Sequence, residues 1–397
     1  MNQTHRRVRL GVLGLGRAFT LMLPTLISDE RIEVVAGYDP RDSAREQLAT
    51  DFGAKAHHSA QALCADPDVE WVYVATPHQM HAEHVLLAAQ HGKSVLVEKP
   101  LALSLEDCQA MIDACAQAQV HLMVGHSHSF NTPVLTAKKI IDDGAYGAVK
   151  MIHAWNYTDF MYRPRRPEEL DTRLGGGVVF SQAAHQVDLV RLLGGGQVLS
   201  VYGCTGQWDQ NRKTEGAYSA LLTFDRGLFA SITYNGYGGY DSDADMNWRG
   251  ELGGAKSPDA HQMTRQRYSQ CTDEAMEAQR KADRNFGGPD YVPAGVSGTQ
   301  TFQHFGPVLI TCERADLRLT PYGVDVYSLD GKVTCHPECS AITRVEVIDE
   351  IWSVAREGGQ VLHSGEWALA TLEVCLGILE SAQTSMPILM HYQIQTL

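Results

Sequence analysis

The stretch Val8–Phe19 reads VRLGVLGLGRAF, an apolar run that ends in closely spaced glycines and leads into a helical pattern. A dinucleotide-binding loop has this context, between the first strand of a parallel sheet and the helix after it. Gly14 permits the tight turn, and Gly16 lets the backbone approach a pyrophosphate at the helix N-terminus, where unpaired amides favour anions. The stretch therefore predicts a Rossmann fold that binds a dinucleotide.

Position 19 departs from the dinucleotide pattern. The third small residue of that pattern sets close packing between helix and strand, whereas this chain has Phe19. Ala18 could take over this role in a shifted register, so Arg17 and Ala18 are expected beside the cofactor together with the two glycines. The alternative is a glycine turn that holds no ligand.

An acidic residue ends the next predicted strand. Asp39 lies 23 residues after Gly16, close to the spacing at which a carboxylate accepts the ribose hydroxyls of NAD. The same charge would repel the 2′-phosphate of NADP, so NAD is the expected cofactor. Arg41, two residues further on, keeps NADP open as the alternative, because an arginine there can bind that phosphate.

The first 125 residues alternate strand and helix patterns, which is typical of a parallel, doubly wound sheet. Strands buried on both faces read as continuous apolar runs. Such runs occur at Val8–Leu13, Ile32–Gly37, Trp71–Ala75, Ser94–Val97 and His121–Val124. Between the last strands, His81–His91 has the spacing of a helix.

The pattern changes after residue 125. Alternating, tyrosine-rich stretches such as Tyr218–Tyr234 indicate a large mixed or antiparallel sheet. The expected fold class is therefore α/β, with a Rossmann domain over residues 1–125. A C-terminal α+β domain over residues 126–397 is expected to carry substrate binding and oligomerisation.

Two segments of this second part have distinct patterns. Residues 241–301 are polar and low in apolar periodicity, apart from a helix-like piece at Asp273–Asp283, and are expected to form an insertion or arm. Ser364–Ala382 returns to a clean helical period.

Charge and hydropathy exclude several classes of partner. The 397-residue chain has 33 Lys and Arg against 47 acidic residues, a formal net charge of −14, which disfavours a nucleic-acid surface. No apolar run of about 18 residues occurs, so no membrane span is expected. The polar start without an apolar core favours a cytoplasmic protein.

The cysteines indicate free thiols rather than a disulfide framework, because they are odd in number and scattered along a long chain. The nine are Cys64, Cys108, Cys115, Cys204, Cys271, Cys312, Cys335, Cys339 and Cys375. The cluster Cys335-His336-Pro337-Glu338-Cys339 is expected to be a structural loop, with a zinc site as the alternative. No metal site is predicted.

Three short motifs follow in order along the chain. They are Thr76-Pro77-His78 with His81, then Glu98-Lys99-Pro100, then Gly175-Gly176-Gly177 with His185 and Asp188. Together with the glycine loop they resemble the Gfo/Idh/MocA oxidoreductases, in detail over about residues 8–200. This resemblance implies an NAD-dependent enzyme that forms a homo-oligomer, either a dimer or a tetramer.

The resemblance also implies roles for individual residues. Thr76, Pro77, His78, His81, Glu98 and Lys99 would contact the cofactor. Lys99 and His185 would be catalytic, either one serving as the base, and both would contact substrate. A lysine at the carboxyl end of a strand, partly desolvated, can act as a general base or proton relay. The alternative for Lys99 is a surface lysine paired with Glu98.

The motif around His185 departs from the family in one respect. Members usually carry an acid four residues before this histidine, where the chain has Ser181 followed by Gln182. A serine cannot act as a carboxylate base, so Ser181 and Gln182 are expected only to hydrogen-bond the substrate. Asp188, one helical turn after His185, could orient it.

Two further histidines, His126 and His128, begin the second domain. They are expected either to touch substrate or to have a structural role. His84 reads as an ordinary helix residue.

Arginines gather ahead of the glycine run that leads to His185. They are Arg163, Arg165, Arg166 and Arg173. Arginine forks bind carboxylates bidentately, so Arg163 and Arg173 are the first candidates to hold a carboxylated substrate. The alternative is a solvated loop in which they pair with Glu168, Glu169 and Asp171.

Within the family, the chain is similar to the branch of bacterial phthalate 4,5-cis-dihydrodiol dehydrogenases. That similarity implies oxidation of a ring carbinol of phthalate 4,5-cis-dihydrodiol to give 4,5-dihydroxyphthalate, with a carboxylated cyclic diol as the small-molecule partner. One alternative is a sugar, cyclitol or sugar-acid dehydrogenase of the same family. Another is a non-catalytic, NAD-binding regulator.

Overall fold

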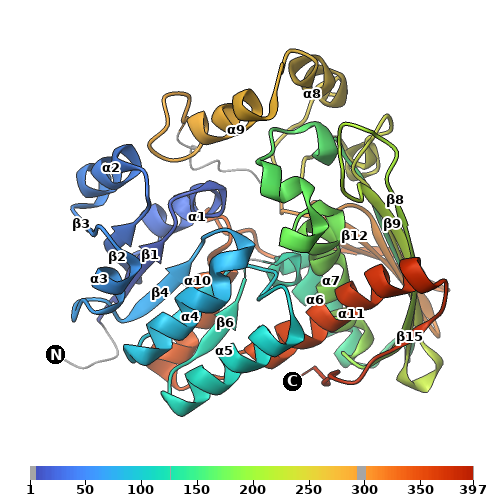
Figure 1. The fold of residues 1–397 in the computed structure, drawn as a ribbon. Helices are drawn as coiled ribbons and strands as arrows, with labels where there is room; N and C mark the ends of the chain where they lie inside the picture. The colour runs from blue at the N-terminus through green and yellow to red at the C-terminus, as the bar shows by residue number, and fades with distance from the viewer. Residues whose placement is uncertain (1–5, 126, 293–300, 397) are drawn as a thin grey trace. The chain divides into compact units, whose positions relative to one another are not determined.

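The computed structural model describes residues 6–125, 127–292 and 301–396, which fall into two compact units. The first unit comprises Met1–His126, Glu277–Ser297 and Ser340–Leu369, and the second comprises Ser127–Met276, Gly298–Cys339 and Ala370–Leu397 (Figure 1). The chain thus returns twice to the first unit after entering the second.

A six-stranded sheet forms the centre of the first unit, and its strands all run parallel. Its order is β3-β2-β1-β4-β5-β6, which confirms the predicted doubly wound Rossmann sheet. The strands are β1 Val8–Leu13, β2 Ile32–Tyr38, β3 Lys55–Ala56, β4 Trp71–Val74, β5 Ser94–Val97 and β6 Leu122–Val124. The strand order reverses between β1 and β4, and ligands of such sheets bind at the carboxyl ends of the strands there.

Helices link the strands of this sheet. They are α1 Arg17–Ser28, α2 Asp42–Phe52, α3 Ala60–Cys64, α4 His81–Gln90 and α5 Leu105–Gln117, joined by α10 Val345–Trp352 from the last returning segment. Helix α4 confirms the helix predicted from His81.

The residue that breaks the dinucleotide pattern packs against the first returning segment. Phe19 in α1 is fully buried, and its ring meets that of Phe286 edge to face with centroids 5.2 Å apart. A large apolar side chain at position 19 therefore contributes to the core of this unit.

A nine-stranded mixed sheet forms the second unit, in the order β14-β13-β12-β11-β7-β10-β9-β8-β15. Among the strands that the structure describes in this sheet, only β7 and β10 pair in parallel, and the mixed sheet confirms the predicted fold class. The strands are β7 Val149–Tyr157, β8 Val198–Gly206, β9 Ala217–Phe224, β10 Phe229–Asn235, β11 Val308–Cys312, β12 Ala315–Thr320, β13 Gly323–Ser328, β14 Gly331–Cys335 and β15 Ile388–Leu389.

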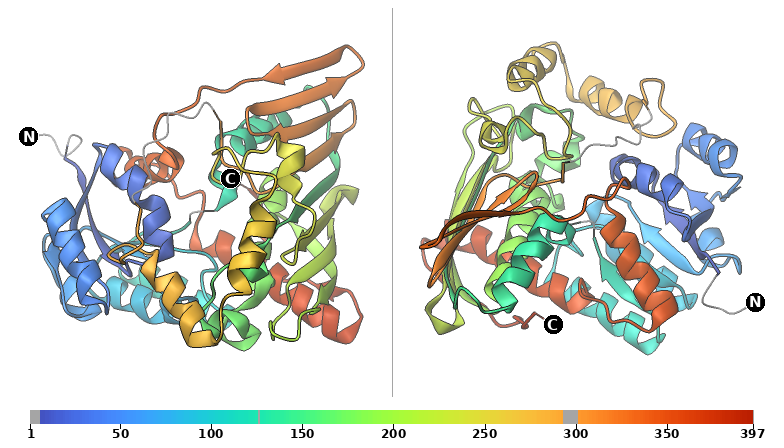
Figure 2. Two further views of the ribbon diagram at one scale, coloured as in Figure 1. Left: turned by 90° about the horizontal axis from the view of Figure 1, so that it is seen from above. Right: turned by 180° about the vertical axis from the view of Figure 1, so that it is seen from behind.

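Helices cover one face of this mixed sheet (Figure 2). Side chains of β7, β9 and β10 alternate between buried and more exposed, as expected when a single face meets the core. The helices of the second unit are α6 Thr132–Asp142, α7 Ala184–Gly194 and α8 Ala260–Tyr268, while α9 Glu274–Asp283 and α11 Gly365–Thr384 cross a unit boundary. The helices predicted at Asp273–Asp283 and Ser364–Ala382 are thereby confirmed.

Helix α7, which carries His185, is anchored by a buried arginine. Arg191 is fully buried and donates from Nε to Gln393 Oε1 at 2.9 Å and from Nη1 to Thr371 Oγ1 at 2.7 Å. Since these acceptors lie in α11 and in the C-terminal tail, two separate segments hold this helix in place.

Candidate active site

The glycine loop of the first unit has the geometry that a dinucleotide requires. Gly14 has φ +90°, and a Cβ there would lie 2.7 Å from the carbonyl oxygen of Ala75, so only glycine fits. A Cβ at Gly16 would meet nothing within 4 Å, which leaves the backbone open to a ligand. Gly16 also precedes the first turn of α1, whose amides favour an anion. These residues fit the pyrophosphate of NAD.

Asp39 lies at the end of β2 and is almost fully enclosed by donors. Its carboxylate accepts the backbone amides of Leu15 at 2.8 Å and Arg41 at 3.0 Å, and the Arg41 guanidinium at 2.9 and 3.2 Å. Arg41 in turn donates to the carbonyl oxygens of Leu15 and Phe286. The pair therefore fixes the glycine loop, and acceptors on the protein already occupy the guanidinium of Arg41.

His81 bridges the two loops that carry the family motifs. Its ring is fully buried, with Nδ1 2.9 Å from the carbonyl oxygen of Pro100 and Nε2 3.0 Å from that of Thr76. Burial lowers the pKa of His81, although the carbonyl contacts act in the opposite direction. His81 thus ties the Thr76-Pro77 loop to the Lys99-Pro100 loop.

The neighbouring histidines of this segment differ in their surroundings. His84 is buried, and its Nδ1 lies 3.0 Å from the Thr76 hydroxyl, which gives this helix residue a contact of its own with the motif. The half-buried ring of His78 meets that of His81 edge to face at 5.7 Å.

Glu98 and Lys99 follow β5 and are half-buried. The fully buried Tyr73 of β4 donates its hydroxyl to Glu98 Oε1 at 2.5 Å. Burial raises the pKa of Tyr73, and the Glu98 charge raises it further, so the phenol stays a donor. Tyr73, which sequence reasoning missed as one of several apolar strand residues, thereby orients the carboxylate next to Lys99.

His185 and His128 lie together in the second unit. Their rings meet edge to face with centroids 4.8 Å apart, and Phe305 packs on both, 4.9 Å from His128 and 4.8 Å from His185. His128 Nε2 lies 3.3 Å from Glu251 Oε1. The structure thus places the predicted His185 within a cluster of aromatic rings and next to the predicted His128.

The residues around His185 on its own helix have different surroundings. Ser181 is half-buried and Gln182 is buried, both in a π-helical turn ahead of α7, a feature frequent at functional sites. Asp188 is buried and accepts a hydrogen bond from the Ser129 hydroxyl, which anchors the turn that holds His128.

The four arginines of the loop have unlike environments. Arg173 has an 89% exposed side chain and forms a bidentate pair with Asp171, while Arg166 pairs with Glu168 at 3.1 Å. Arg165 lies over the Phe160 ring at 3.5 Å. Arg163 is 39% exposed and donates from Nε to Asp159 Oδ1 at 2.8 Å.

Arg163 is also the arginine that shares an electrostatic environment with the histidine cluster. Burial acts to lower its pKa, but the charges of Asp159 and Glu251 help to raise it overall. Glu251, whose charge acts on Arg163, also lies 3.3 Å from His128.

The remaining predicted residues are placed as follows. His126 lies outside the described residues. Arg17 begins α1 directly after Gly16, and Ala18 is its second residue. Across the described parts of the chain, no group of three or more His, Cys, Asp or Glu side chains could hold a metal ion. Nor does any helix there have the length and apolar character needed to cross a membrane.

The fold and the site define the class of protein, a two-domain dinucleotide-dependent oxidoreductase. Its features are a parallel sheet with a glycine loop and a paired acid, and a second unit built on a mixed sheet. Residues 8–126 match the model of the oxidoreductase family with an NAD-binding Rossmann fold, and residues 134–256 match the GFO/IDH/MocA C-terminal domain. The chain therefore belongs to the Gfo/Idh/MocA family and is an NAD-dependent dehydrogenase, rather than a non-catalytic regulator.

Similar proteins include enzymes with different substrates. The 1-carboxy-3-chloro-3,4-dihydroxycyclohexa-1,5-diene dehydrogenase of Comamonas testosteroni is 46% identical over 380 residues, which covers 95% of both chains. The scyllo-inositol 2-dehydrogenase (NAD(+)) of Bacillus subtilis is 32% identical over half of this chain and 57% of its own. A protein of known crystal structure from Bordetella bronchiseptica RB50 is 37% identical to this chain. The two structures superpose with a TM-score of 0.91, and the match covers 96% of this chain and 100% of the Bordetella chain.

Proposed function

We propose that this dehydrogenase oxidises a ring carbinol of a carboxylated cis-dihydrodiol, with phthalate 4,5-cis-dihydrodiol as substrate and 4,5-dihydroxyphthalate as product. The observation that carries the proposal is Arg163, a charged and partly enclosed arginine that is held by Asp159 and on which Glu251, the neighbour of His128, acts through its charge. In a chain of net charge −14, a cation held there favours an anionic substrate.

Arg163 has the chemistry for a carboxylate. Asp159 occupies its Nε, with the pKa of Asp159 lowered to about 2 by Arg163, Thr264 and His261 against the effect of burial. The carboxylate therefore stays charged and holds the guanidinium in one orientation. A guanidinium has five N–H donors in a fixed fork, so its terminal amino groups can take up a substrate carboxylate. Arg173 remains the second candidate, and its exposure makes it the weaker one.

The roles of the other residues follow from the chemistry of the reaction. NAD, when bound, accepts the hydride at C4 of its nicotinamide. Lys99 or His185 takes the proton of the hydroxyl group as the C–H bond breaks. The hydroxyketone that results tautomerises to a catechol, and aromatic stabilisation drives the reaction forward. Such a substrate requires little from the base, which is consistent with Ser181 in place of an acid.

The relative from Comamonas testosteroni supports the substrate class and favours a second candidate. Its name specifies one carboxyl group and a chlorine on the diol-bearing ring, and it shares 46% identity with this chain. A monocarboxylated chlorodiol is therefore the alternative to the phthalate diol. Sugars and cyclitols remain the next alternative, because the inositol dehydrogenase is similar over half of the chain.

A substrate panel tests the proposal. Purified protein and NAD are mixed in turn with phthalate 4,5-cis-dihydrodiol, the carboxylated chlorodiol, an uncharged cis-benzene dihydrodiol and scyllo-inositol, and NADH formation is followed. We expect kcat/KM for at least one carboxylated diol to exceed that for the uncharged diol by roughly 10-fold or more, the scale of one charged hydrogen bond. Preference for inositol or for the uncharged diol would contradict the proposal.

We also propose a cytoplasmic homo-oligomer, a dimer or a tetramer. The face of the mixed sheet opposite its helices carries exposed Leu199, Tyr202, Leu221 and Phe229, and apolar patches of this kind mark association surfaces. No disulfide joins any of the nine cysteines in the described parts of the chain, as is usual in a reducing compartment. Light scattering of the purified protein tests the oligomer, and cell fractionation tests the compartment.

A further inference from the structure

Helix α8 packs with one face on the turn that leads to Arg163. The Arg265 guanidinium lies over the Tyr162 ring, 4.5 Å from its centre, and the centre of the Tyr268 ring lies 5.4 Å from that of the same ring. This face is polar and aromatic rather than aliphatic. Its members, which are spaced by three and four residues and therefore share one side of the helix, are His261, Thr264, Arg265 and Tyr268.

Thr264 connects this face of the helix to the arginine. Its hydroxyl donates a hydrogen bond to the carboxylate of Asp159, a buried side chain whose Oδ1 accepts from Arg163 Nε at 2.8 Å. His261, one turn earlier in the helix, also favours the charged form of Asp159. Because a carboxylate held by hydrogen bonds from two sides has little freedom to rotate, Thr264 helps to fix the orientation of Arg163.

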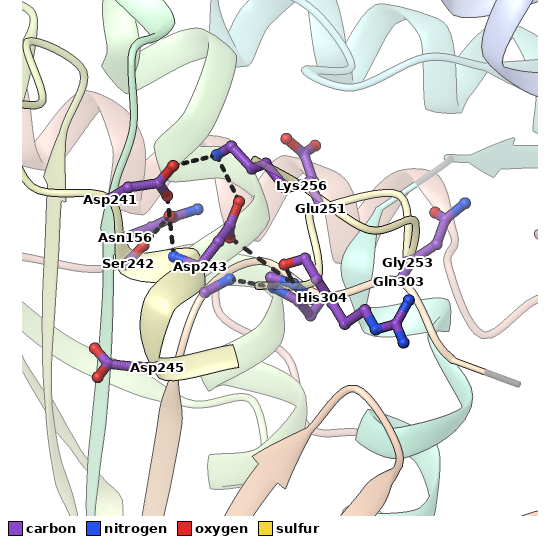
Figure 3. A network of polar contacts seen from close by, with 12 residues as sticks. Asn156, Asp241, Ser242, Asp243, Asp245, Glu251, Gly253, Lys256, Gln303 and His304 are labelled. Atoms are coloured by element: carbon purple, nitrogen blue, oxygen red, sulfur yellow. Dashed lines mark hydrogen bonds and ion pairs between the residues drawn. The ribbon is translucent and has the colours of Figure 1, made fainter. Parts of the chain in front are cut away.

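The N-terminal end of α8 is anchored by a buried ionic network (Figure 3). Lys256 Nζ lies 2.7 Å from Asp241 Oδ2 and 2.6 Å from Asp243 Oδ2. The same Oδ2 atom of Asp241 lies 3.0 Å from Nε2 of His261, the second residue of the helix and a buried one. Since charged partners that are removed from water are costly to separate, the network fixes the start of α8.

The backbone around Asp159 is attached to the mixed sheet. The amide of Met161 donates to the carbonyl oxygen of Gly236 at 2.9 Å. The hydroxyl of Thr158 lies 2.7 Å from that of Tyr234 in β10. Strand β10 and the residue after it therefore hold the backbone of this turn, while α8 holds the side chain of Asp159.

Helix α8 contributes little to the core of its unit. Of the nine residues that the structure describes in this helix, His261 alone is buried. The match to the GFO/IDH/MocA C-terminal domain ends at residue 256, before the helix begins. Contacts that add little apolar burial and lie outside the shared domain are better suited to the choice of substrate than to folding or to chemistry common to the family.

We propose, on the basis of the function proposed above, that helix α8 sets the preference for a carboxylated substrate and that Thr264 is its positioning residue. Thr264 holds Asp159, and Asp159 orients the guanidinium of Arg163 before the substrate binds. An arginine oriented in advance loses little side-chain freedom on binding, so its affinity for a carboxylate is higher. Thr264 acts only through these two residues and has no part in the oxidation of the hydroxyl group.

The test is Thr264→Val, which keeps the shape of the side chain and removes its hydroxyl. We expect KM for the preferred carboxylated diol of the substrate panel to rise by roughly 3- to 10-fold, the scale of one hydrogen bond. The kcat for this diol, and both constants for cis-benzene dihydrodiol, should stay within about twofold of the wild type. Thr264→Ser, which retains the hydroxyl, should keep the wild-type KM. The matched control is Thr136→Val, which removes a half-buried hydroxyl from helix α6 of the same unit.

The double variant Arg163→Ala/Thr264→Val separates positioning from a general structural effect. If Thr264 acts through Arg163, its replacement should change KM by less than about twofold once the guanidinium is absent. A rise in KM as large as that in the wild-type background would overturn the inference. Equal rises for the carboxylated and the uncharged diol in the single variant would overturn it as well.

A second measurement does not require turnover. The Nε–H signal of Arg163 in NMR spectra, assigned by its loss in Arg163→Ala, gives an order parameter for the guanidinium. We expect this order parameter to be high in the wild type and in Thr264→Ser, and lower in Thr264→Val. An unchanged order parameter contradicts the positioning role. A protein that is inactive on every diol, but in which Thr264→Val loosens Arg163, overturns only the proposed function.

Discussion

The Nε atom of Arg163 lies 2.8 Å from Oδ1 of Asp159, four residues earlier in the chain, and this pair fixes the orientation of an arginine on which the charge of Glu251 also acts. An arginine held by a partner from its own loop loses little side-chain freedom when it binds a second anion. The pair is therefore suited to recognition rather than to stability alone.

Arg163→Ala should raise KM for a carboxylated dihydrodiol by roughly 10- to 100-fold, the equivalent of about 1.5–3 kcal/mol for a hydrogen bond to a charged group. KM for an uncharged diol should change little. Steady-state kinetics on the two substrates provide the comparison. Arg166→Ala is the matched control, because its similarly exposed side chain pairs with Glu168 in the same loop. Equal effects of both variants on both substrates would leave the arginines as surface residues.

Lys99→Ala should lower kcat by roughly 100-fold or more, the usual scale for removal of a general acid or base. Cofactor affinity should change little, because the glycine loop and Asp39 supply the expected contacts to the pyrophosphate and the ribose. NADH formation under saturating conditions measures kcat, and fluorescence titration measures NADH binding. A nearly normal kcat would assign the base to His185 instead.

Asp39→Asn should lower the ratio of kcat/KM for NAD to that for NADP by about 10-fold or more, because the variant removes a charge that repels the 2′-phosphate. The wild type should prefer NAD clearly. Arg41 does not oppose this preference, since it already donates to Asp39, Leu15 and Phe286. Comparable values of kcat/KM for the two cofactors in the wild type would disprove the argument.

Much of the first unit could be predicted because buried parallel strands leave continuous apolar runs. Strands β1 and β5 have the predicted ends, and β2, β4 and β6 differ by one residue at one end. The fixed spacing of the glycines predicted the cofactor loop for a similar reason. Position 14 must be glycine because the carbonyl oxygen of Ala75 lies too close to it for a Cβ. Local patterns of this kind depend on neighbours in the sequence.

The Glu251 contact could not be predicted, because it joins residues 123 positions apart and leaves no periodic signal. The same holds for Phe286, whose packing on Phe19 explains the departure from the glycine pattern only after the structure is known. Sequence alone also could not rank Arg163 above Arg173. Both have an acidic residue close by, and only the fold determines which one faces solvent.

The buried ring of His81 should make the stability of the first unit depend on pH. Burial lowers the pKa of its ring, so the folded chain binds fewer protons than the unfolded chain near the unperturbed value of 6.5. The free energy of unfolding is then fully present above that pH and falls as the pH drops below it, by up to about 1.4 kcal/mol for each unit of pKa lowering. The melting temperature should therefore decrease between pH 7.5 and 5.5, and His81→Gln should show a smaller decrease.

The control is His58→Gln, at an exposed position of the same unit, which should retain the wild-type dependence. Thermal unfolding of the three proteins across this range decides the matter, and equal slopes for all three would show that the His81 bridge between Thr76 and Pro100 does not titrate.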